Sequence, residues 1–158
     1  IAGGPCTCNP EPVAELFDAM VVGDGESVIL EMADAWMAWR GAGSTDKNEL
    51  LERWAQVPGV YVPSFYRFRI GSGGLSWLEP DSAERRAVTR AVVADLEKAP
   101  FPDRPVVPFG RPVHDRLRLE VSRGCTRGCR FCQAGMIYRP VRERSCDRLL
   151  SLDRKSNV

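Results

Sequence analysis

Apolar side chains recur at helical spacing in two stretches of the first third of the chain. The first predicted helix covers residues 26–40 and stops at Gly41. Its apolar stripe consists of Val28, Met32, Ala35, Trp36 and Trp39. The second predicted helix covers residues 46–56 and is stopped by Pro58-Gly59. Its apolar positions are Leu50, Leu51 and Trp54.

Alternating apolar and polar residues predict strands further along the chain. Residues 60–63 and 65–70 alternate in this way. The glycine-rich segment 71–74 that follows could be a phosphate loop, but it lacks the lysine and the following helix that such loops need. A hairpin turn is therefore the favoured interpretation.

A third alternating stretch predicts a strand over residues 116–122, where Leu117, Leu119 and Val121 alternate with charged residues. Ser145 is predicted to be the N-cap of a helix. The apolar residues of that helix are Leu149, Leu150 and Leu152. A cysteine-rich segment lies between the predicted strand and this helix.

Three cysteines stand in this segment, Cys125-Thr-Arg-Gly-Cys129-Arg-Phe-Cys132. Their spacing lets three thiolates bind three corners of one iron–sulfur cube, and no fourth cysteine follows at a matching distance, so one iron stays open. The alternatives are buried thiols, a zinc site or a disulfide framework. Zinc sites usually present two pairs of ligands with a longer spacer, and disulfides need an oxidising compartment. An iron–sulfur site is the favoured interpretation.

The same segment resembles the signature of radical S-adenosylmethionine (radical SAM) enzymes, which place an aromatic residue before the last cysteine. The longer stretch 123–145 is similar to a bacterial subfamily of cobalamin-binding-type Fe–S oxidoreductases. The resemblance implies a [4Fe–4S] cluster on Cys125, Cys129 and Cys132. It also implies that S-adenosylmethionine chelates the open iron through its amino and carboxylate groups. Reductive cleavage of the sulfonium then gives a 5′-deoxyadenosyl radical that abstracts hydrogen from a substrate the sequence does not identify.

Other residues around the cluster loop acquire expected roles from this resemblance. Phe131 is expected near the adenine, shielding the cluster from water; the alternative is a core aromatic. Arg127 and Arg130 either offset the charge of the cluster or are solvated, while Gly124 and Gly128 either let the backbone wrap around the sulfurs or are ordinary loop glycines. Reduction of the cluster requires an electron donor such as flavodoxin or ferredoxin.

The first part of the chain is similar to the last units of a Rossmann-like cobalamin-binding domain, through Gly3-Gly4-Pro5 and the turn Gly23-Asp-Gly-Glu26. The two glycines of that turn permit a sharp strand-to-helix connection, and Glu26 suits a first helical turn. Cobalamin binding is possible in the parent protein but not expected in this chain. In such domains the cobalt-ligating histidine lies in an earlier loop, whereas His114 is expected to be a hydrogen-bonded residue leading into a strand.

These resemblances predict an α/β chain in three parts. Residues 1–41 would end a Rossmann-like cobalamin-binding-type domain, residues 42–113 would be a connector, and residues 114–158 would be the first β/α unit of a partial TIM-type radical SAM barrel. Within the connector, residues 84–98 fit a helix by their apolar spacing, whereas the family pattern suggests an extended linker. Both alternatives stay open.

A fragment of a larger enzyme is expected, because only 26 residues follow Cys132 and a (β/α) barrel needs roughly 200 or more. Its main partner would be the rest of its own parent chain, and alone it is expected to be inactive. Cys6 and Cys8, one residue apart, make an incomplete metal site, and Cys146 is expected to be incidental.

Charge is distributed unevenly along the chain. Residues 1–40 carry one basic and seven acidic side chains, whereas residues 111–158 carry twelve basic and five acidic ones. Compensation of an anionic cluster and an acidic neighbouring domain is the favoured explanation. A basic iron–sulfur module that binds or modifies RNA is the alternative, and an inert truncated fragment is the third.

The expected location is the cytoplasm, without membrane attachment. No apolar run approaches the ~20 residues of a membrane-spanning helix, and no secretory leader opens the chain. Six cysteines without such a leader indicate a reducing compartment.

Overall fold

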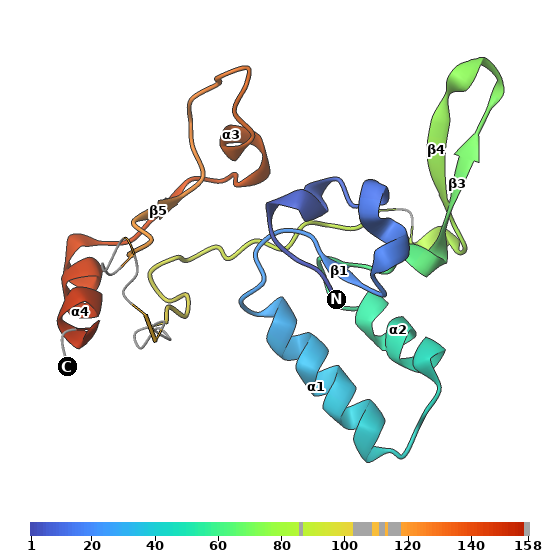
Figure 1. Cartoon of the computed structure of the whole chain (residues 1–158), viewed down its shortest axis with the longest axis horizontal. Coiled ribbons are helices and arrows are strands. Elements are labelled where there is room, and N and C mark those ends of the chain that lie inside the picture. The colour runs from blue at the N-terminus through green and yellow to red at the C-terminus, as the bar shows by residue number, and fades with distance from the viewer. Residues whose placement is uncertain (86, 103–108, 111–112, 114–117, 157–158) are drawn as a thin grey trace. The chain divides into compact units, whose positions relative to one another are not determined.

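The chain folds into two units, unit 1 (Ile1–Val92) and unit 2 (Val93–Val158) (Figure 1). The computed structural model describes residues 1–85, 87–102, 109–110, 113 and 118–156. His114 and the first part of the strand predicted over residues 116–122 lie outside these residues. The domain boundaries predicted after residues 41 and 113 stay predictions.

Unit 1 contains both helices that the apolar spacing predicted. Helix α1 covers Val28–Gly41 and helix α2 covers Lys47–Ala55. Asp46 begins α2, because its side-chain Oδ1 accepts a hydrogen bond of 2.9 Å from the backbone N–H of Asn48. One position was predicted wrongly, since Trp36 is 46% exposed and lies outside the buried stripe.

The core of unit 1 is formed by the inward faces of these helices and by the segments around the first strands. Its buried residues are Ala19, Val21, Val28, Met32, Trp39, Leu50, Leu51, Trp54, Val60, Val62 and Phe65. Both buried indoles have hydrogen-bond acceptors: Trp54 Nε1 donates to Met32 O over 2.9 Å and Trp39 Nε1 to Asp46 O over 3.0 Å. The two tryptophans therefore pack without leaving a buried donor unpaired.

A small sheet and its extensions lie against this core. Strand β1 (Met20–Val21) pairs antiparallel with β2 (Val60–Tyr61), and Ala2 forms a parallel bridge with Met20. Beyond β1, Gly23 has φ = 106° and forms a parallel bridge with Ala91, whose carbonyl oxygen lies where a Cβ would come within 2.2 Å. The predicted turn between a strand and α1 is therefore confirmed.

The segment between the two units resolves an open alternative. Residues 83–85 form a short 3-10 helix (η5, Ala83–Arg85), and residues 87–98 contain no helix. The helical alternative for residues 84–98 is therefore wrong over residues 87–98, which are irregular and end in a turn at residues 96–98. Earlier in unit 1 the described residues also form the 3-10 helices η1 (Pro5–Cys8), η2 (Glu11–Leu16) and η3 (Pro63–Phe65).

A two-stranded hairpin follows η3 (Figure 1). Strand β3 (Tyr66–Ile70) pairs antiparallel with β4 (Ser76–Pro80), with Phe68 opposite Leu78. A 3-10 turn, η4 (Ser72–Gly74), joins the strands, and the N–H of Gly71 donates to Leu75 O over 2.8 Å. The hairpin interpretation of the glycine-rich segment is therefore confirmed.

Unit 2 contains strand β5 (Ser122–Arg123), helix α3 (Ala134–Ile137), strand β6 (Arg142–Glu143) and helix α4 (Cys146–Ser156). Residues 118–121 form no strand, so β5 coincides only with the end of the predicted strand. The N-cap prediction is confirmed, because the N–H of Arg148 donates to Ser145 Oγ over 3.1 Å. Within the described residues the sheets have two strands each, and the Rossmann-like domain and the barrel stay predictions.

Candidate metal centre

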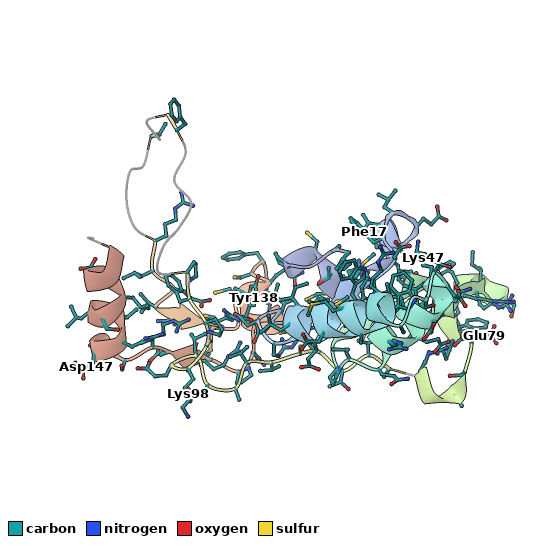
Figure 2. The ribbon with its side chains drawn as sticks, turned by 90° about the horizontal axis from the view of Figure 1, so that it is seen from below. Phe17, Lys47, Glu79, Lys98, Tyr138 and Asp147 are labelled. Carbon is teal, nitrogen blue, oxygen red and sulfur yellow. The ribbon has the colours of Figure 1, made fainter. Side chains whose placement is uncertain are left out.

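The three cysteines lie on one loop of unit 2, which we call the cysteine loop (residues 124–141). Strands β5 and β6 pair antiparallel at its base, with Ser122 opposite Glu143 and Arg123 opposite Arg142. The loop with α3 can be followed in Figure 1, and its Tyr138 is labelled in Figure 2. Pairing of the strands brings the two ends of the loop together.

Gly124 begins the loop in a conformation that requires glycine. Its φ is 94°, and a Cβ there would lie 2.4 Å from Tyr138 O and 3.0 Å from Pro140 O. Gly135 is also closely packed, since its Cβ would lie 2.7 Å from Arg127 O. Around Gly128, in contrast, no atom of the described structure lies within 4 Å of a Cβ position. The loop therefore folds back on itself at Gly124 and Gly135.

The thiol groups of the loop are accessible and free. Cys125 and Cys132 are half-buried and Cys129 is exposed. The backbone N–H of Arg127 donates to Cys125 Sγ over 3.4 Å, a contact that would stabilise negative charge on that sulfur. The N–H of Cys132 donates to Cys129 O over 3.1 Å and closes a turn within the motif.

The three thiols of the loop do not form a metal-binding group in this conformation. Among the described residues, no three Cys, His, Asp or Glu side chains form a group that could hold a metal ion as they stand. The donor set itself fits an iron–sulfur cluster, because three free thiols share one loop and one sulfur already accepts an N–H. Cys125, Cys129 and Cys132 stay predicted ligands, and binding would require the three thiols to come together around one cluster.

The remaining residues predicted around the site are exposed. Phe131 is 91% exposed, so the alternative that made it a core aromatic is wrong, whereas its role beside an adenine stays a prediction. Arg127 and Arg130 are exposed as well, and both explanations of their charge remain open. Cys6 and Cys8 lie in η1, and Cys146 is the first residue of α4. All three are exposed free thiols.

Two buried arginines on and after β6 were missed by the sequence analysis. Arg142 is 7% exposed and donates three hydrogen bonds to backbone carbonyl oxygens: Nη1 to Val93 O (2.7 Å), Nε to Pro140 O (3.0 Å) and Nη2 to Tyr138 O (3.2 Å). Arginines in a charged segment usually face water, and the sequence contains no signal for acceptors that are backbone groups. Arg142 thus connects the end of the cysteine loop to the start of unit 2.

Arg144 is 5% exposed and, like Arg142, donates hydrogen bonds to the segment at the start of unit 2. Its Nη1 donates to Leu96 O over 2.5 Å, and its guanidinium carbon lies 5.4 Å from the centroid of the Phe101 ring. Its Nη2 lies 3.5 Å from Oε2 of Glu120, which also accepts two hydrogen bonds from Arg123, of 2.8 and 2.9 Å. These hydrogen bonds and the charge of Arg123 hold the pKa of Glu120 below its ordinary value.

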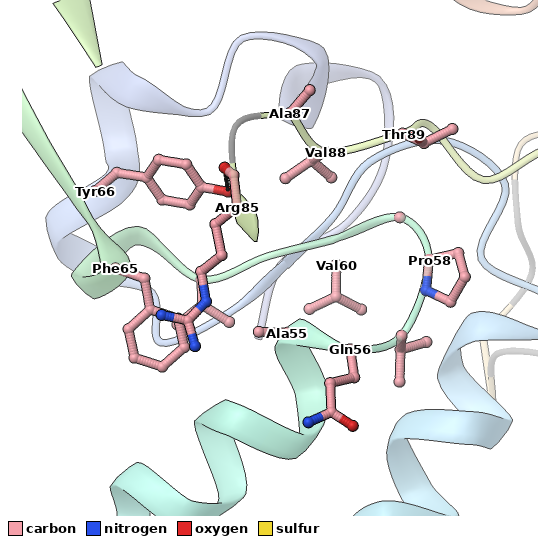
Figure 3. Close-up of a pocket in the computed structure, with 13 residues that line it drawn as sticks. Ala55, Gln56, Pro58, Val60, Phe65, Tyr66, Arg85, Ala87, Val88 and Thr89 are labelled. Carbon is pink, nitrogen blue, oxygen red and sulfur yellow. Dashed lines mark hydrogen bonds between the residues drawn. The ribbon is translucent and has the colours of Figure 1, made fainter. Parts of the chain in front are cut away.

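Unit 1 contains a separate cavity of about 240 Å³ between the end of α2, the β2–η3 segment and residues 85–89 (Figure 3). Arg85 is the charged side chain among its described lining residues, and its guanidinium carbon lies 4.1 Å from the centroid of the Phe65 ring. That guanidinium is paired with Asp81 over 2.6 Å and with Glu52. Tyr66 Oη donates to Arg85 O over 2.9 Å, and burial raises the pKa of this phenol. The contacts of Arg85 thus hold the wall of the cavity together.

The N-terminal part of the chain is similar to a known protein family. Residues 1–63 match the family described as radical SAM proteins, N-terminal. This match supports the placement of the chain in the radical SAM superfamily, whose signature the cysteine motif resembles. The matched residues end before the cysteine loop begins, so the match and the motif are two separate indications.

One relative covers nearly the whole chain. Uncharacterized protein MJ0966 of Methanocaldococcus jannaschii is 31% identical over 159 residues, which is 96% of this chain and 27% of the relative. The chain therefore spans about a quarter of the length of that relative. No solved structure matches the chain. Among the described residues, no helix is long and apolar enough to cross a membrane.

Proposed function

We propose that the cysteine loop binds a [4Fe–4S] cluster through Cys125, Cys129 and Cys132, as part of a radical SAM enzyme. The observation that carries the proposal is the coincidence of a radical SAM N-terminal match over residues 1–63 with three free thiols at cluster spacing on one loop. When bound, such a cluster supplies the electron for reductive cleavage of S-adenosylmethionine.

The residues of the chain have defined tasks in this proposal. The three thiolates hold three irons, and the N–H of Arg127 stabilises charge on the sulfur of Cys125. Phe131, which is almost fully exposed, is available to cover the adenosyl group of S-adenosylmethionine. In this proposal Arg127 and Arg130, which lie on the same loop, would offset the negative charge of a thiolate-ligated cluster.

The activity of the whole enzyme belongs to a longer protein in this proposal. The chain spans 27% of its relative, so groups that hold the rest of S-adenosylmethionine and the substrate would come from outside these residues. Cobalamin binding is proposed for the parent protein only. The substrate class is not part of the proposal, and RNA stays an alternative tested by retention on RNA at moderate salt.

Anaerobic reconstitution with iron and sulfide tests the ligand assignment. The wild-type chain is expected to take up iron and to show thiolate-to-iron charge-transfer absorbance, and Cys125→Ala, Cys129→Ala and Cys132→Ala are each expected to abolish it. The matched controls are Cys6→Ala, Cys8→Ala and Cys146→Ala, which remove free thiols elsewhere and are expected to leave iron content unchanged. Equal iron loss in both sets would contradict the assignment.

A further inference from the structure

The two ends of the cysteine loop meet at one pair of backbone carbonyl oxygens, those of Tyr138 and Pro140. Gly124, the residue before Cys125, packs so closely against both that a Cβ would lie 2.4 Å from the first and 3.0 Å from the second. Arg142 donates a hydrogen bond to each of the same two oxygens, of 3.2 and 3.0 Å. One glycine and one arginine therefore converge on the point where the loop closes.

Both carbonyl groups accept a hydrogen bond from a side chain. The β5–β6 ladder pairs Ser122 with Glu143 and Arg123 with Arg142, so residues 138–140 lie beyond its end. A packed backbone carbonyl group is stabilised by a hydrogen-bond partner, and here that partner is the guanidinium of Arg142. The planar fork of arginine presents donors in several fixed directions, which a lysine ammonium does not.

The third hydrogen bond of Arg142 extends beyond the loop. Nη1 donates to Val93 O over 2.7 Å, at the start of the segment that we call the linker (residues 93–99). Arg144 donates to Leu96 O and Ala99 O of the same linker, and within the residues that the structure describes it forms no hydrogen bond with the cysteine loop. The two buried arginines thus share the linker, and only Arg142 reaches the loop.

We propose that Arg142 is the positioning residue of the cysteine loop. Arg142 fixes the positions of Tyr138 O and Pro140 O through its hydrogen bonds. Gly124 packs against these two oxygens, so Arg142 also fixes the backbone position of Gly124 and of the next residue, Cys125. Its role in cluster binding rests on the proposed function above, whereas its hold on the loop does not. The three hydrogen bonds of Arg142 described above end on backbone carbonyl groups, so its effect on a cluster would be transmitted through the backbone.

Amide hydrogen exchange of the cluster-free chain, read by mass spectrometry, tests the hold on the loop. Arg142→Met is expected to accelerate exchange over residues 124–140, and Arg142→Lys to give an intermediate rate because it retains part of the donor set. Gly124→Ala places a Cβ against the same two carbonyl oxygens, and it is expected to accelerate exchange in the same peptides. Arg144→Met is the matched control, since it removes a buried arginine from the same linker and is expected to open residues 93–99 instead.

The cluster-loaded chain supplies a second readout. After reconstitution, Arg142→Met is expected to retain cluster on the order of tenfold more weakly than wild type, with a changed electron paramagnetic resonance spectrum of the reduced cluster. Arg144→Met is expected to keep the wild-type spectrum.

Equal opening of the loop in the Arg142→Met and Arg144→Met chains would overturn the proposal, because it would assign the effect to general loosening of unit 2. Unchanged loop exchange in Arg142→Met would overturn it as well. A wild-type chain that binds no cluster would instead refute the proposed function, and the exchange experiment would still decide the role of Arg142.

Discussion

Units 1 and 2 are stabilised by different kinds of buried side chain. The core of unit 1 is apolar and includes two tryptophans, two leucines and a methionine from α1 and α2. In unit 2 the buried side chains among the described residues are Leu96, Ala99, Leu152, Arg142 and Arg144. Unit 1 therefore has a large apolar core, whereas unit 2 buries fewer apolar side chains and adds hydrogen bonds from two buried guanidinium groups.

The difference follows from what each unit has to hold. Two amphipathic helices can bury their apolar faces against each other and against short strands, and this burial is not directional. The cysteine loop exposes Cys129 and Phe131 and leaves Cys125 and Cys132 half-buried, so it presents no comparable apolar face for burial. Its carbonyl groups are bound by arginine instead, which fixes a particular backbone path with few apolar contacts.

The largest expected effect tests the apolar core of unit 1. Trp54→Ala is expected to lower the free energy of unfolding by about 3–5 kcal/mol, because it leaves a cavity in the core. It also removes the hydrogen bond to Met32 O. Urea unfolding followed by circular dichroism measures the loss. The control is Trp36→Ala on the exposed face of α1, expected to change stability by less than about 1 kcal/mol. Similar losses in both variants would show that the core does not lie where we place it.

A smaller effect is expected from a polar contact of unit 2. Ser145→Ala is expected to destabilise α4 by about 1 kcal/mol, because it removes the N-cap hydroxyl that accepts a hydrogen bond from the Arg148 N–H. Ser151→Ala is the matched control: its hydroxyl donates to Arg148 O within the helix, so alanine is expected to be neutral or slightly stabilising there. Hydrogen exchange of residues 146–156 separates the two. Faster exchange in the Ser151 variant than in the Ser145 variant would contradict the cap assignment.

The sequence predicted unit 1 better than unit 2, and the same comparison explains why. Helical spacing located α1 and α2 to within two residues at each end, since an apolar stripe is itself the cause of the packing. Trp36 was misplaced because the apolar arc of α1 is wider than the core that covers it. Turn chemistry located the β3–β4 hairpin, where glycines are required by the backbone.

In unit 2 the sequence located the cysteine loop and the Ser145 cap, but not the contacts that hold them. Spacing of cysteines identifies a ligand set without its geometry, and the three thiols are not gathered in the described structure. Arg142 and Arg144 could not be identified as buried, because their acceptors are backbone carbonyl groups more than 40 residues away or within the loop itself. Strand β5 was misplaced because its pairing with β6 sets its position, and alternation of residues does not.

The smallest effect concerns the pH dependence of unit 2. Glu97 accepts hydrogen bonds from Ser145 Oγ (2.7 Å) and from the Ser145 N–H (2.9 Å), and these bonds lower the pKa of the Glu97 carboxyl in the folded chain. Because the folded pKa is below that of the unfolded chain, this carboxylate contributes stability at neutral pH. The contribution is lost as the pH falls from the ordinary pKa of 4.5 through the folded pKa.

Wild type is therefore expected to be slightly more stable than Glu97→Gln at pH 7. Urea unfolding of both chains at a series of pH values measures this difference. The difference should shrink toward zero in acid, while other carboxylates affect both chains equally. A difference that stays constant or grows as the pH falls would show that the contact of Glu97 with Ser145 does not link α4 to the linker.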